Sequence, residues 1–156
     1  MAIGSSAQAH GTGAIALGSG TQARGDGAVA LGYGQIHDGS NAGWYRYAFA
    51  AGKGVARGEG AVAFGQGFAK GAYSFASGTD STSALGYSSF AFGQGVDVEN
   101  IGEVAFGKYN AHVKTSEDVI GTAFTIGNGT ATQSSNLFAI YTNGDTIITG
   151  SLTYKN

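Results

Sequence analysis

The chain has 156 residues, 12% of them charged, and a formal net charge of −2 at pH 7. Its 8 basic residues against 10 acidic ones give no basic surface for nucleic acid or for an anionic membrane, so we expect neither partner. No apolar run is long enough to span a bilayer, no signal-peptide pattern opens the chain, and the lack of cysteine excludes a disulfide framework.

Glycine recurs every seven residues in the first part of the chain, from Gly4 to Gly39. A similar apolar segment recurs beside every second glycine, as in residues 14–18 and 28–32, so the full repeat is about fourteen residues. A helix with one glycine per heptad would lose about 1 kcal/mol at each, relative to alanine. Short apolar runs separated by glycine instead predict strands and tight turns. The sequence therefore predicts an all-β solenoid, which is a scaffold before anything else.

The recurring glycines are predicted to be structural, because a turn in the left-handed region favours glycine. They include Gly4, Gly11, Gly18, Gly25, Gly32, Gly65, Gly93 and Gly107. Asn100 stands where a glycine is expected, and asparagine is an ordinary residue that tolerates positive φ.

The two halves of the repeat differ in polarity. In residues 28–31 both faces of the predicted strand are apolar, whereas residues 21–24 carry one small inward Ala23 between polar groups. An apolar wall of this length predicts packing against copies of the chain. We assign the aromatic residues of the repeats to the core: Phe64, Phe68, Tyr73, Phe75, Phe90, Phe92 and Phe106.

One interval breaks the repeat and predicts an inserted loop at about residues 33–51. It is the best candidate binding site, because aromatic faces can stack on sugar rings and the polar residues beside them can bind hydroxyl groups. The alternative is that the aromatics pack against a neighbouring subunit. The candidate residues are Trp44, Tyr45, Tyr47, Arg46, Asn41 and His37, with Asp38 beside them.

The repeat ends near residue 118, which divides the chain into head repeats at 1–118 and a C-terminal β segment at 119–156. Residues 137–142 and 146–149 flank Asn143-Gly144, a pair typical of a type I′ hairpin turn. We expect this hairpin to cap the open end of the solenoid, where strand edges would otherwise stay unpaired.

Other motifs favour structural interpretations. Arg24-Gly25-Asp26 matches an integrin-binding tripeptide, but residues 56–60 use the same turn template with Glu59. Asn128-Gly129-Thr130 fits a glycosylation sequon and also a turn. No catalytic motif is present, and the three histidines lack metal-ligand spacing, so no enzyme activity, metal or cofactor is predicted; a metal on an assembly axis stays an alternative. The acids of residues 97–100 are placed in a turn.

The phrases at 14–18, 28–32 and 61–65 resemble the YadA-like head of trimeric autotransporter adhesins. This resemblance covers about residues 2–107 and implies a left-handed parallel β-roll, assembled as a homotrimer and displayed on a fibre outside the cell. Phage tail fibres use similar repeats. Residues 126–145 resemble a tail-fibre segment that often precedes a cleaved intramolecular chaperone, and the neck, stalk and anchor of the autotransporters have no counterpart here.

These observations favour a non-enzymatic attachment-fibre segment that binds a cell-surface receptor, with a glycan favoured over a protein. The first interpretation is a receptor-binding tail-fibre tip on a virion. The alternatives are a bacterial trimeric adhesin head and a purely structural shaft segment. Because the chain opens inside a repeat, we expect it to be a fragment of something longer.

Overall fold

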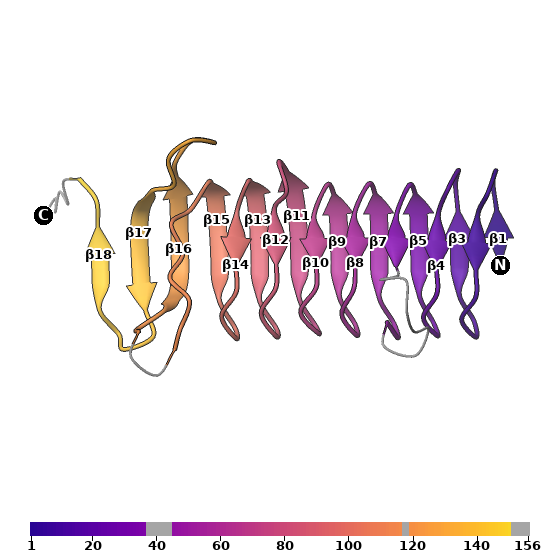
Figure 1. Ribbon diagram of the computed structural model, residues 1–156, viewed down its shortest axis with the longest axis horizontal. Helices are drawn as coiled ribbons and strands as arrows, with labels where there is room; N and C mark the ends of the chain where they lie inside the picture. Colours follow the sequence, from indigo (N-terminus) through magenta and orange to yellow (C-terminus); the bar gives the residue numbers. More distant parts are fainter. Residues whose placement is uncertain (37–44, 117–118, 151–156) are drawn as a thin grey trace, which may run out of the picture.

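The computed structural model describes residues 1–36, 45–116 and 119–150. Every regular element in these ranges is a β-strand, and the strands stack along one axis into a two-sided solenoid (Figure 1). The predicted all-β solenoid with repeats of about fourteen residues is confirmed. Within the described ranges, no helix has the length and apolarity needed to cross a membrane.

The strands form two sheets, and the chain passes from one to the other at each half-repeat. Sheet A contains β1 (Ala2–Ile3), β3 (Ile15–Leu17), β5 (Val29–Gly32), β7 (Phe49–Gly52), β9 (Val62–Gly65), β11 (Phe75–Thr79), β13 (Phe90–Gln94), β15 (Val104–Lys108), β16 (Thr122–Asn128), β17 (Asn136–Tyr141) and β18 (Thr146–Ile148). Sheet B contains β2 (Gln8–Ala9), β4 (Gln22–Ala23), β6 (Gln35–Ile36), β8 (Val55–Ala56), β10 (Phe68–Ala69), β12 (Ser83–Ala84) and β14 (Asp97–Val98).

Small side chains fill the space between the two sheets. Ala16 pairs with Ala30 and Ala30 with Ala50, and all three are fully buried. The same inward row continues through Ala63, Ala76, Ala91 and Ala105 on sheet A, and sheet B contributes Ala23, Ala56, Ala69 and Ala84. Alanine is short enough to let the sheets approach closely, so the core is narrow.

The assignment of the aromatic residues to the core is wrong. Phe92 is 50% exposed, Tyr73 is 53% exposed, and none of the seven residues assigned above is buried. Since side chains alternate across a strand, an inward Ala91 forces Phe90 and Phe92 outward. We call each turn of the solenoid, with one strand in each sheet, a rung. The phenylalanines of neighbouring rungs then stack on one another on the outer face, as Phe75 and Phe90 do with ring centroids 4.5 Å apart.

Two rows of side chains on the outer face of sheet A, from β3 to β16, form a surface that we name the apolar ladder. It consists of two rows that the strand register aligns, and no position in them carries a charge. The rows are Ile15, Val29, Phe49, Val62, Phe75, Phe90, Val104 and Phe124, and Leu17, Leu31, Ala51, Phe64, Ser77, Phe92, Phe106 and Ile126.

Glycine recurs for two different physical reasons. Gly18 has φ +126° and Gly32 has φ +75°, a backbone conformation that other residues rarely adopt. Gly71 has no positive φ, but a Cβ added there would overlap the carbonyl oxygen of Gly86 on the next rung. Asn100 follows Gly71 and Gly86 at the equivalent position of the next rung, and it has no positive φ. The expectation that asparagine stands there because it tolerates positive φ is therefore wrong. Its side chain instead forms hydrogen bonds with residues of the following segment, Val113 and Thr115.

We expect Gly71→Ala to destabilise the protein more than Gly20→Ala. Gly20 has φ +69° and open space around a new Cβ, so its replacement costs about 1–2 kcal/mol of left-handed strain. At Gly71 two rungs would have to separate to admit the methyl group. Urea unfolding of both variants, followed by circular dichroism, measures the difference. An equal or smaller loss at Gly71 would contradict the close-approach argument.

The C-terminal segment extends sheet A beyond the last strand of sheet B (Figure 1). β16 pairs in parallel with β15, and Gly127 aligns with Gly107 as in the repeats. β17 and β18 then form the predicted antiparallel hairpin, which is confirmed. The predicted type I′ turn is wrong: Gly144 has φ +92° but Asn143 has no positive φ, and the Gly144 N–H donates to the Tyr141 carbonyl as in a type I turn followed by a left-handed glycine.

A buried polar network closes the core where sheet B stops. Glu103 occupies the position held by Ser74 and Ser89 on the preceding rungs, and its side chain is fully buried. Its Oε2 accepts hydrogen bonds from the backbone N–H groups of Glu99 and Asn100, both at 3.0 Å. Its Oε1 accepts one at 2.5 Å from the Thr122 hydroxyl, so the carboxylate joins the last rung to β16.

Asparagine side chains take the place of a missing strand at the edge of β14. The Asn110 amide bonds both backbone groups of Asp97, at 2.8 Å each, as a neighbouring peptide would. Asn136 does the same for Ala111, at 3.0 and 2.6 Å. A primary amide carries a donor and an acceptor, as a peptide group does, so the edge is satisfied without another strand.

We expect Glu103→Ala to loosen the C-terminal end of the solenoid selectively. The substitution leaves two buried backbone N–H groups without an acceptor, at a cost of about 1–3 kcal/mol for each such group. Hydrogen exchange should quicken in residues 97–125 and stay unchanged in the first three rungs. Ser89→Ala is the matched control, since its hydroxyl makes one 2.8 Å bond to Gly86. Uniform protection along the variant chain would contradict the role of Glu103.

Candidate functional site

The predicted binding loop falls partly outside the described residues. His37, Asp38, Asn41 and Trp44 lie in the range 37–44, which the structure does not describe. The strands β6 and β7 flank this range, so both parts of the solenoid continue up to it. Its remaining predicted residues, Tyr45, Arg46 and Tyr47, are described.

Tyr45 and Tyr47 have different surroundings. Tyr45 is only 4% exposed and belongs to the core cluster, at the turn position that glycine holds in the neighbouring rungs. Tyr47 is 69% exposed and has φ 58°, and Arg46 beside it is exposed. Arg46 and Tyr47 thus present their side chains outside the solenoid, and Tyr45 anchors the turn.

Backbone hydrogen bonds between rungs place these residues on one continuous edge. The Tyr47 N–H donates to the Asp26 carbonyl at 2.9 Å, and the Gly60 N–H donates to the Arg46 carbonyl at 2.8 Å. The Tyr73 N–H donates to the Glu59 carbonyl at 2.7 Å, one rung further. We name this row of turns, each of which precedes a strand of sheet A, the tyrosine edge; its exposed side chains include Arg46, Tyr47, Glu59, Tyr73 and Tyr87.

Glycine makes room for the tyrosine rings on this edge. A Cβ at Gly27 would lie 2.9 Å from the Tyr47 ring, and one at Gly60 would lie 2.7 Å from the Tyr73 ring. Tyr73 also meets Tyr87 edge-to-face, with ring centroids 5.6 Å apart. The rings therefore lie over the preceding rung, and Tyr73 and Tyr87 are each 53% exposed.

Sequence reasoning missed Tyr73 and Tyr87 as site residues. The first was assigned to the core, and the second was not singled out. The available signal is the alternation of glycine and tyrosine at one turn position, in Gly27, Tyr47, Gly60 and Tyr73. The longer interval between Gly27 and Tyr47 obscures this alternation in the sequence spacing.

Charged groups accompany the rings. The carboxylate of Glu59 raises the pKa of Tyr73 above its ordinary value, because a nearby negative charge disfavours ionisation of the phenol. Arg46 adds a guanidinium group on the adjacent turn. Flat apolar faces with donors and acceptors at their rims suit a ligand with a hydrophobic face and hydroxyl groups.

The Arg24-Gly25-Asp26 tripeptide is part of the scaffold. Arg24 is half-buried, Gly25 is buried, and the Asp26 carboxylate accepts a hydrogen bond at 2.8 Å from the backbone N–H of Thr12. These contacts agree with the structural interpretation of this motif.

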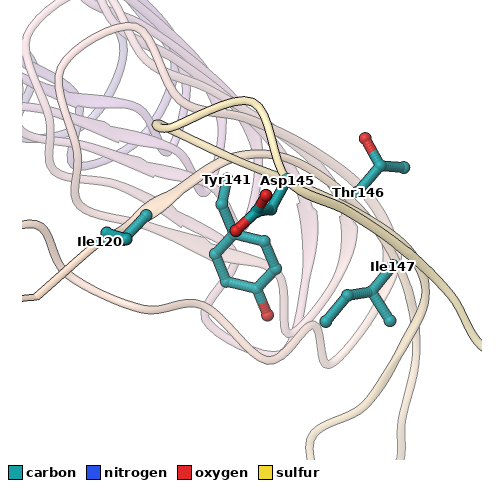
Figure 2. A pocket seen from close by; sticks show the side chains of 5 residues that line it. All are labelled: Ile120, Tyr141, Asp145, Thr146 and Ile147. Carbon is teal, nitrogen blue, oxygen red and sulfur yellow. The ribbon is translucent and has the colours of Figure 1, made fainter.

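An open pocket lies at the C-terminal hairpin (Figure 2). Its lining residues are Ile120, Tyr141, Asp145, Thr146 and Ile147. Ile120 and Ile147 are 50% and 51% exposed and flank the Tyr141 ring, so the pocket is a shallow, mainly apolar hollow and lies far along the axis from the tyrosine edge.

Comparison with protein families finds the YadA head domain repeat twice, at residues 1–21 and 9–34. No curated protein and no solved structure matches the chain. The matched residues form the first rungs, from β1 to β5, and the same register continues through β15. The N-terminal rungs of this solenoid are therefore similar to YadA head domain repeats.

Proposed function

We propose that this chain is part of the head of a homotrimeric adhesin, a left-handed β-roll displayed at the bacterial cell surface, that attaches to a receptor without catalysis. The family match carries the proposal, because YadA-type adhesins are homotrimers with head domains outside the cell. The apolar ladder supports it independently.

The apolar ladder is the surface that assembly would cover. It runs the length of the solenoid, and several of its side chains are open to water, Phe92 at 50% and Phe64 and Phe106 at 38% each. Soluble monomers rarely expose an apolar patch larger than a few hundred Å². Three ladders facing a common axis would remove these side chains from water, which favours association by about 25 cal/mol per Å².

We expect light scattering after size exclusion to give about three times the chain mass of 15.6 kDa. Phe92→Glu should dissociate the assembly, because it would bury one carboxylate per chain at the interface. Tyr87→Glu is the matched control: this residue is about as exposed as Phe92 but lies on the tyrosine edge. A stable wild-type monomer, or equal dissociation by both variants, would contradict the proposed interface.

The tyrosine edge and the residues of the adjoining 37–44 range are the proposed receptor site. Tyr47 and Tyr73 present aromatic faces two rungs apart, about 9.5 Å along the axis, with Arg46 and Glu59 beside them. A glycan chain offers apolar ring faces and hydroxyl groups in succession and fits such an edge. Weak binding by one chain would be multiplied by three identical sites.

We expect Trp44→Ala and Tyr47→Ala each to weaken binding to a glycan array or to host cells at least tenfold, about 1.4 kcal/mol. Aromatic anchors commonly dominate such interfaces, and we expect neither substitution to lower the melting temperature much. Tyr33→Ala is the control, since Tyr33 is 60% exposed on the opposite turn edge. Unchanged binding by both variants would favour a purely structural shaft segment.

A phage tail-fibre tip is the second candidate. The segment from β16 to β18 favours it, because these strands lie beyond the matched repeats and carry the motifs that resemble tail fibres, in which a C-terminal chaperone is often released. The genes that flank the coding sequence discriminate between the two: structural phage genes would favour a virion, and an autotransporter anchor domain would favour the adhesin.

A further inference from the structure

Two acids and a histidine meet on the outer face of sheet B at its last rung. Asp97 lies on β14, and Glu99 follows two residues later on the same face. The acids therefore lie on and directly after a strand, and their assignment to a turn is wrong. The chain returns past this rung after β15 and brings His112 against them, and all three side chains are half-buried.

This pair of acids departs from the repeat. The register of sheet B gives the positions equivalent to Asp97 and Glu99 on each preceding rung, and in the described rungs they are neutral, apolar or basic. The equivalent described pairs are Gln8 and His10, Gln22 and Arg24, Val55 and Arg57, Phe68 and Lys70, and Ser83 and Leu85. Acidic side chains enter where the solenoid ends and where a histidine arrives.

The distances fit a small cation between the three groups. One potential ligand atom from each residue lies within 4.8 Å of the others. His112 Nε2 is 3.4 Å from Asp97 Oδ2, which is longer than a good N–H···O hydrogen bond. Two ligands bonded at about 2.0–2.1 Å to a tetrahedral Zn²⁺ lie about 3.4 Å apart, the length of one edge of the tetrahedron.

Neighbouring groups orient Asp97. The Ser83 hydroxyl donates to Asp97 Oδ1, which leaves Oδ2 facing His112, and the Asn110 amide holds the Asp97 backbone. Such outer hydrogen bonds fix the ligands of a metal site. Lys114 Nζ lies 3.0 Å from Glu99 Oε2, but this side chain is 69% exposed, and water can take up its charge when a metal binds Glu99.

We propose that Asp97, Glu99 and His112 bind Zn²⁺. One imidazole and two carboxylates are ligands that Zn²⁺ accepts, and water completes a fourth position on the solvent side. The metal joins β14 to the segment at 111–115, next to the buried Glu103 network. Metal binding would therefore stabilise the C-terminal end of the solenoid. The site lies on sheet B, opposite the apolar ladder, so the proposal does not depend on the trimer.

Titration calorimetry with Zn²⁺ and thermal unfolding with and without Zn²⁺ test the proposal on the whole chain. We expect one Zn²⁺ per chain and a higher melting temperature in its presence, because a ligand that binds the folded state stabilises it. His112→Ala should weaken binding at least tenfold and abolish the shift in melting temperature. His10→Ala is the control, since it removes an exposed histidine that directly follows β2, at the opposite end of the solenoid.

Two further measurements keep the test decisive. Asp97→Asn preserves the shape of the side chain and should also weaken binding, whereas Lys114→Ala should strengthen it by freeing Glu99. Co²⁺ in place of Zn²⁺ should give the intense visible absorption of tetrahedral coordination in the wild type and not in His112→Ala. No Zn²⁺ binding by the wild type, binding that survives in both ligand variants, or equal loss in His10→Ala would each overturn the proposal.

Discussion

The close approach of the two sheets governs the rest of this structure. Each rung places one alanine of sheet A against a buried residue of sheet B, which is alanine in most rungs and Ile36 or Val98 in two of them. Glycines such as Gly71 and Gly86 bring backbone against backbone between rungs. A core this narrow buries little apolar volume per rung. Between the strands it leaves no room for aromatic rings, so those of sheet A lie on its outer face, and the buried ring of Tyr45 lies at a turn. The apolar ladder is thus a consequence of the narrow core. Association of chains would cover this surface and bury the apolar area that a single chain leaves exposed to water.

Much of the fold could be predicted from the sequence because the repeat is strict. The alternation of glycine with short apolar runs predicts the solenoid, and the apolar segments around Asn143 predict the hairpin. The aromatic residues could not be placed correctly, because a strand with apolar residues on both faces does not say which face is inside. The usual expectation puts the large side chain in the core. The alanine at the centre of each apolar segment was the more informative residue. A small residue that recurs at one position indicates the inward face, because only a small side chain fits between closely spaced sheets.

The irregular positions needed the structure for a different reason. Asn100 and Glu103 break the repeat at neighbouring places, and their partners, Val113, Thr115 and Thr122, come from the segment that follows the repeat. No periodicity relates these segments, so their contacts could not be read from spacing. The same holds for His112, which meets Asp97 only because the chain returns along β14. Only part of the tyrosine edge could be predicted from the sequence. Arg46 and Tyr47 were singled out because they interrupt the repeat, whereas Tyr73 and Tyr87 lie within the regular repeat and were not.

These features divide the surface of the solenoid by function. The two rows of the apolar ladder on the outer face of sheet A carry no charge and suit copies of themselves, so they are unsuited to a polar receptor. The turn position that Gly27 and Tyr47 share has no such constraint: the backbone N–H of either residue donates to the preceding rung, although their side chains differ. Recognition can therefore evolve on the turn edges, and a metal site on sheet B, without disturbing the assembly face. In a chain built from repeats, departures from the repeat on those surfaces are where individual chemistry is found.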